Sequence, residues 1–269
     1  MMERSITRRS VAFFFLLLIA VIAQAHEFWM QPDKFLFSVG EAARVNFMVG
    51  ENFTGERWKV NPQRFIRLDH HAASYSEGLI EKLNSGQENS IEVKLEKEGT
   101  HLFVMQSTNA FTELAAEEFN EYLKEDGLDD ILAFRQKNNQ MDKPAREFYS
   151  RHTKLLVKAG EKSDDTYKKV VGLPLEIIPV NDPYKAKRGD AITFQVLYEG
   201  KPLQFAMVKV WNRKDGITFT QNIYTMKDGT IETRLSNTGS WMVSCVKMVP
   251  AREEGADWQS YWASLVFGY

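Results

Sequence analysis

The chain has 269 residues, of which 43% are hydrophobic and 26% are charged, a composition typical of a soluble globular protein. Its formal net charge of −2 gives no electrostatic reason to expect nucleic acid as a partner. The single cysteine, Cys245, excludes an internal disulfide, so the fold must depend on the packing of its core. Because Cys245 lies in an apolar strand pattern, we expect it to be buried.

The first 25 residues have the pattern of a cleaved export signal. Three arginines precede an apolar run over residues 11–23, and Ala23-Gln24-Ala25 is a small-x-small cleavage site. We therefore expect residues 1–25 to be a signal peptide and the protein to be periplasmic or otherwise extracytoplasmic. A retained anchor and a twin-arginine signal are the alternatives. No later apolar run approaches the roughly 20 residues that span a bilayer, so no membrane span is expected after cleavage.

Residues 26–172 are expected to form a first β-sandwich domain with a helical insertion. Alternating apolar residues predict two strands within residues 35–49 and further strands at 64–68, 91–95 and 100–106, separated by turns rich in Asn, Gly, Ser and Pro. Helix formers dominate residues 112–150, with Thr112 as the expected N-cap and Pro144 beginning a further short helix. The acidic residues of this insertion are interpreted as a solvated helix face.

Residues 173–269 are expected to form a second, smaller sandwich. Seven strands separated by turn signals are predicted, at 175–180, 192–198, 206–211, 218–225, 231–235, 241–248 and 261–267. The predicted fold class is thus mainly β, with two antiparallel β-sandwich domains of Ig-like or transthyretin-like type that meet near residue 172.

His26 is the first candidate metal ligand. Cleavage after Ala25 would make it the N-terminal residue, with a free amine and an imidazole that together form a bidentate nitrogen chelate. Such donors suit Cu(II), Ni(II), Co(II) or Zn(II). The alternative is that His26 merely begins an edge strand. A copper-dependent oxidative enzyme would need a second histidine close to His26.

The other candidate ligands are His101, His70 and His71. His101 shares a strand face with Met105, and such a pair could serve copper, although a histidine bonded within a sandwich core is more usual. His70 and His71 are adjacent, so at most one of them would join a common site in a strand. An exposed turn is their alternative interpretation, and His152 is expected to be structural.

No catalytic signature is present in the sequence, and we expect the protein not to be an enzyme. Three aromatic residues near the C-terminus, Trp258, Tyr261 and Trp262, could form a sugar-binding platform. The alternative is that Trp262 belongs to the core and that Tyr261 faces away from it.

Several residue runs resemble the DUF4198 family of exported bacterial proteins, which overlaps the periplasmic component of cobalt/nickel uptake systems. These runs include 25–32, 149–151, 154–156, 172–177, 181–183, 197–203, 239–241 and 257–263. The C-terminal part also resembles carboxypeptidase-regulatory-like sandwiches. Related sequences often carry histidine at the position of Lys247, and a protonated lysine is a poor metal ligand.

The resemblance implies an exported protein that binds or delivers a transition metal ion in association with an uptake system. Cobalt and nickel follow from the family, while copper follows from the donor chemistry. A membrane metal transporter is the implied partner. The alternative is a non-catalytic module of the cell envelope that recognises protein or glycan.

Overall fold

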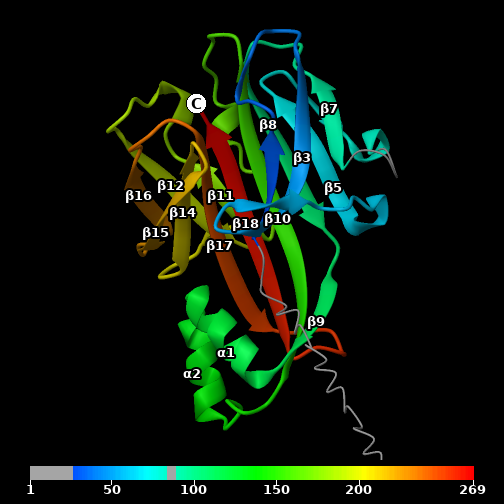
Figure 1. The fold of residues 1–269 in the computed structure, drawn as a ribbon, viewed down its shortest axis with the longest axis vertical. Coiled ribbons are helices and arrows are strands. Elements are labelled where there is room, and N and C mark those ends of the chain that lie inside the picture. Colours follow the sequence, from blue (N-terminus) through cyan, green and yellow to red (C-terminus); the bar gives the residue numbers. More distant parts are fainter. Residues whose placement is uncertain (1–26, 84–88) are drawn as a thin grey trace, which may run out of the picture.

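The computed structural model describes residues 27–83 and 89–269, and the predicted signal peptide and His26 lie outside them. Within the described residues the chain forms 18 strands and two α-helices, which confirms the prediction of a mainly β protein (Figure 1). None of the helices in this part of the chain has the length and apolar character needed to cross a membrane.

The strands form three sheets. The central sheet has the order β15 (Ile217–Tyr224), β14 (Met207–Lys214), β17 (Ser240–Pro250), β18 (Trp258–Gly268), β10 (Ala145–Ala159), β8 (Gly99–Ser107), β5 (Phe65–Ala72), β6 (Tyr75–Gly78), with β2 (Leu36–Phe37) and β9 (Ala110–Leu114) also paired to β10. The N-sheet contains β1 (Glu27–Pro32), β3 (Ala42–Glu51), β4 (Thr54–Arg57) and β7 (Ser90–Lys94). The C-sheet contains β11 (Leu175–Pro179), β12 (Ala191–Tyr198), β13 (Lys201–Pro202) and β16 (Thr230–Arg234).

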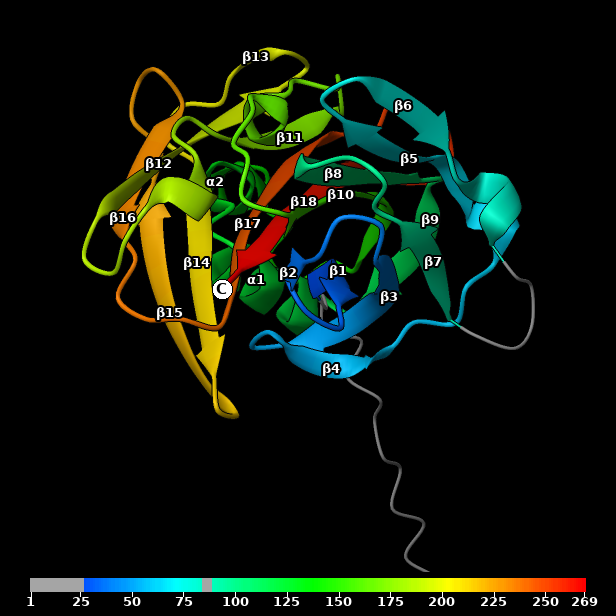
Figure 2. The same cartoon turned by 90° about the horizontal axis from the view of Figure 1, so that it is seen from above.

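The two smaller sheets cover opposite faces of the central sheet. On β10, Leu155 and Val157 pack into a core with residues of the N-sheet, whereas Leu156 packs into a separate core with residues of the C-sheet. This follows from the alternation of side chains along a strand. Seen from above, the central sheet therefore lies between two outer layers (Figure 2).

Strands from both sides of residue 172 share the central sheet. β10 pairs with β18 in parallel, with His152 opposite Ala263. β10 also pairs in parallel with β2, and the other strand pairs in the described residues are antiparallel. Alternation within a segment predicts that a strand forms, but it does not specify the partner strand.

The helical insertion is shorter than predicted. The helices are α1 (Ala116–Glu125) and α2 (Asp129–Lys137), and they pack on β17 and β18 through side chains such as Phe119, Met248 and Trp258. The predicted N-cap at Thr112 is wrong, because Thr112 lies in β9 opposite Glu147. The short helix predicted from Pro144 is also wrong, because residues from Ala145 onward form β10. Pairing with β9 and β18 outweighs the local helix preference there.

Candidate functional site

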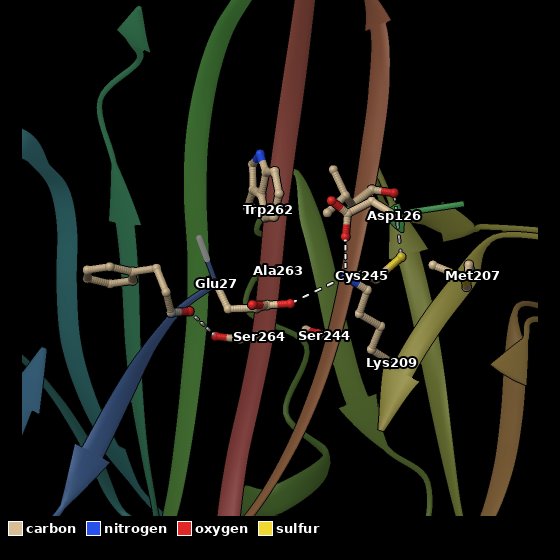
Figure 3. A pocket seen from close by; sticks show the side chains of 11 residues that line it. Glu27, Asp126, Met207, Lys209, Ser244, Cys245, Trp262, Ala263 and Ser264 are labelled. Carbon is tan, nitrogen blue, oxygen red and sulfur yellow. Dashed lines mark hydrogen bonds and ion pairs between the residues drawn. The ribbon is translucent and has the colours of Figure 1, made fainter. Parts of the chain in front are cut away.

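A polar cleft of about 460 Å³ lies where β1 begins. Its walls come from β1, β14 and the end of α1, and a deeper pocket continues from it toward β17 and β18 (Figure 3). Glu27, Asp126 and Lys209 line both the cleft and the deeper pocket, and we call these three residues the acidic cluster.

The acidic cluster contains two carboxylates that share one ammonium group. Lys209 Nζ lies 2.6 Å from Asp126 Oδ1 and 3.4 Å from Glu27 Oε1. Figure 3 shows both carboxylates directed at Lys209. Glu27 is 7% exposed and Asp126 is 6% exposed, so both are largely removed from water. With all three groups ionised, the cluster carries one uncompensated negative charge.

Asp126 is held in the cluster by the shape of the helix end. It is the C-cap of α1, and the next residue, Gly127, has a φ of +64°. A Cβ added to Gly127 would lie 2.5 Å from the Cβ of Met207, so the turn fits against β14 only as glycine. A carboxylate is disfavoured at the negative end of a helix, which leaves Lys209 as its compensating charge.

The environment moves the pKa of every member of the cluster. Burial raises the pKa of Glu27 to about 7, with Lys209 opposing this and Asp126 adding to it. Burial also raises the pKa of Asp126. For Lys209, burial lowers the pKa, but the two carboxylates outweigh it and the pKa ends above its usual value. Near neutral pH the cluster therefore holds a proton that a bound cation would displace.

Glu27 is expected to make the protein less stable as the pH rises from about 5 to 7. The folded protein keeps the Glu27 proton up to about pH 7, whereas an unfolded glutamate loses it near pH 4.3. Because the folded state then binds more protons than the unfolded state, stability falls with rising pH, by on the order of 2–3 kcal/mol. Urea denaturation at both ends of this range measures the loss, and it should be clearly smaller in Glu27→Gln. Equal losses in the two proteins would contradict the prediction.

A third buried carboxyl group, that of Glu147, lies outside the acidic cluster. Glu147 accepts hydrogen bonds from the hydroxyl groups of Tyr122, at 3.1 Å, and Ser260, and Ser260 in turn accepts one from the indole of Trp262. Burial raises the pKa of Glu147 to about 7, and the charge of Asp126 raises it further. The sequence analysis did not identify Glu147, which lies in the segment that it assigned to a helix.

His70 and His101 lie together in the structure. His70 Nε2 is 2.8 Å from His101 Nδ1, and the remaining nitrogens bond Glu77 Oε1, at 3.1 Å, and the carbonyl of Lys97, at 2.8 Å. Burial lowers the pKa of both histidines, for His70 to about 4. A metal ion between the two rings would have to replace these hydrogen bonds.

His71 makes separate contacts and does not join this pair. Its Nδ1 lies 2.6 Å from the hydroxyl of Ser76 and 3.2 Å from the ammonium of Lys169. Burial lowers the pKa of His71 to about 4, and the charge of Lys169 lowers it further. Lys247 forms an ion pair with Asp130 of α2, at 3.1 Å, and does not line the cleft.

The described residues do not form a metal site by themselves. Across residues 27–83 and 89–269, no group of three or more His, Cys, Asp and Glu residues could hold a metal ion. Cys245 lines the deeper pocket and is buried as predicted, but burial raises the pKa of its thiol to about 12, so it is protonated and a poor ligand. The acidic cluster supplies two oxygen donors, and any nitrogen donor must come from elsewhere.

The fold and the cleft define a mainly β protein with a buried acidic cluster at the start of its first described strand. The chain belongs to the DUF4198 family, described as a domain of unknown function, whose model matches residues 23–248. The matched region contains all three residues of the acidic cluster. The search of curated proteins found no match to this chain.

Proposed function

We propose that the protein is exported and that it binds or delivers a transition metal ion, cobalt or nickel by resemblance, at the start of its mature chain. One observation carries this proposal. The two buried carboxylates of the acidic cluster converge on Lys209, and one of them belongs to Glu27, the residue that directly follows His26. The candidate chelate of the sequence is thus adjacent in the chain to Glu27, one of the two candidate oxygen ligands of the cleft.

The donor set follows from covalent geometry. Consecutive Cα atoms are about 3.8 Å apart, and one peptide bond joins His26 to Glu27, so the proposed site combines the amine and imidazole of the one with the carboxylate of the other. Two nitrogens from His26 and carboxylate oxygens from Glu27 and Asp126 make a mixed N/O set that suits Co(II), Ni(II) or Cu(II). Loss of the Glu27 proton would accompany metal binding, so affinity should rise with pH through 7.

In this proposal Lys209 acts as a tethered cation. It neutralises part of the charge of Glu27 and Asp126 when no metal ion is bound. A metal ion must displace its ammonium group, which lowers the net affinity and favours release. Reversible binding suits a delivery protein better than a storage protein, and a membrane metal transporter is the proposed recipient.

The remaining proposals rest on the sequence analysis. We propose that residues 1–25 are a signal peptide, that the protein is periplasmic, and that it has no catalytic activity. We interpret the fold as two sandwiches that share the central sheet as a common layer, with the Ig-like or transthyretin-like character resting on the resemblance. The alternative function is a non-catalytic envelope module that recognises protein or glycan.

Two substitutions in the cluster should change metal affinity in opposite directions. In protein that begins at His26, Glu27→Gln removes an anionic ligand and should weaken Co(II) or Ni(II) binding at least tenfold, about 1.4 kcal/mol. Lys209→Met removes the competing cation and should strengthen binding by a similar factor. Calorimetric titration measures both affinities, with Glu232→Gln as a control, because Glu232 is an exposed carboxylate on β16. An envelope module would show neither change, and unchanged affinity in both variants would refute the site.

A further inference from the structure

A second cleft, of about 390 Å³, lies on the face of the central sheet that the C-sheet covers elsewhere. Its floor is formed by alternate side chains on one face of two neighbouring strands. These are Phe148, Ser150 and His152 on β10, and Gln259 and Tyr261 on β18. The same faces of these strands continue into the core beneath the C-sheet. Pro174, just before β11, lines the cleft, so it lies at the edge of the C-sheet.

His152 is the unusual member of this floor. Only 1% of the residue is exposed, yet neither ring nitrogen makes a hydrogen bond of normal geometry within the described residues, although the backbone of Trp262 lies close enough to affect the pKa of the ring. Burial lowers its pKa to about 3, which the backbone of Trp262 offsets only in part, so the ring is neutral. A neutral imidazole presents one N–H donor and one acceptor. Buried polar groups without partners are rare in native proteins and call for an explanation.

The other side chains that line the cleft restrict the class of ligand that could bond to His152. Tyr261 lies beside His152, with ring centroids 5.8 Å apart, and Phe148 adds a second half-buried aromatic ring. The amides of Asn109 and Gln259 line the cleft and are joined by a hydrogen bond of 3.2 Å. Arg252 and Glu253 also line the cleft, but both are exposed and their charges are opposite in sign. The cleft therefore suits a neutral ligand that offers hydroxyl groups to the imidazole and amides and an apolar face to the rings.

From these features we propose that the cleft around His152 binds a carbohydrate, with a sugar hydroxyl group bonded to the imidazole and the ring lying against Tyr261. This site is separate from the acidic cluster and does not depend on metal binding. A peptide would bind differently, by pairing its backbone with a free strand edge rather than by bonding the imidazole. Over residues 258–266, β18 is paired on both sides, whereas β10 pairs with β18 alone over residues 150–155, so the test below includes peptides.

The imidazole nitrogens provide a direct test in the wild-type protein. The probes are the methyl glycosides of glucose, galactose, mannose and N-acetylglucosamine, added to tens of millimolar while long-range ¹H–¹⁵N spectra report the ring nitrogens. At least one glycoside should shift the signals of His152. If none of them does, the proposal is wrong, and a shift that only peptides cause would also overturn it.

Two variants test the roles of the floor residues. His152→Phe keeps a ring of similar size without the nitrogens, and Tyr261→Ala removes the stacking face. Each should weaken binding of the active glycoside at least tenfold, whereas Tyr224→Phe on exposed β15 should not change it. His152→Phe should melt at or above the wild-type temperature, because it removes unpaired buried nitrogens. Wild-type affinity in His152→Phe would overturn the proposal, and if that variant does not fold, the wild-type spectra and Tyr261→Ala decide.

Discussion

Glu176→Gln should destabilise the fold by about 3–5 kcal/mol, because it leaves a buried lysine without its counter-charge. Lys154 and Glu176 are each 1% exposed, and Lys154 Nζ lies 2.5 Å from Glu176 Oε1. The carboxylate also accepts hydrogen bonds from the backbone N–H groups of residues 171, 172 and 173, at 2.8–3.2 Å. It thereby fixes the segment that joins β10 to β11.

Chemical denaturation measures this loss, and an exposed ion pair provides the control. Asp130 is paired with Lys247, but its side chain is 62% exposed, so Asp130→Asn should change stability by no more than about 1 kcal/mol. The double variant Lys154→Met/Glu176→Gln should be more stable than Glu176→Gln alone, since no buried charge is then left unpaired. If Glu176→Gln lowers the free energy of unfolding no more than Asp130→Asn does, the buried pair of Lys154 and Glu176 does not stabilise the fold as proposed.

Blocking the amine of His26 should reduce metal affinity by about 100-fold, roughly 2.7 kcal/mol. An additional residue before His26 turns the amine into an amide, which is a poor donor, and so opens the chelate. The imidazole and the carboxylates of Glu27 and Asp126 would remain, so weak binding should persist. Calorimetric titration with Co(II) and Ni(II) measures the difference.

The sequence predicted individual strands well because alternation is a local property. Ile91 and Val93 show it clearly, and they lie in β7 as buried core. The parallel pairing of β10 with β18 was not predictable, because it joins segments far apart in the chain. The same long-range pairing explains why the segment after Pro144 is a strand.

The candidate site was predictable only in part. The sequence analysis singled out the run that contains Glu27, but it did so because of His26 and gave Glu27 no role. Asp126 was interpreted as part of a solvated helix face, which is wrong, because the turn at Gly127 buries it against β14. An Asp-Gly pair at the end of a helix was the available signal for a fixed C-cap. Nothing local connects Asp126 to Lys209, which the packing of the helices on the central sheet brings to it.

The most direct test of the metal proposal compares two forms of one protein. Both forms are titrated with Co(II) and Ni(II) after mass spectrometry has established where each chain begins, one at His26 and the other with a residue added before it. The account predicts binding tighter than about 10 μM, roughly 6.8 kcal/mol, for the free amine, and a large loss for the blocked form. Equal affinities in the two forms, or no binding by either, would contradict it.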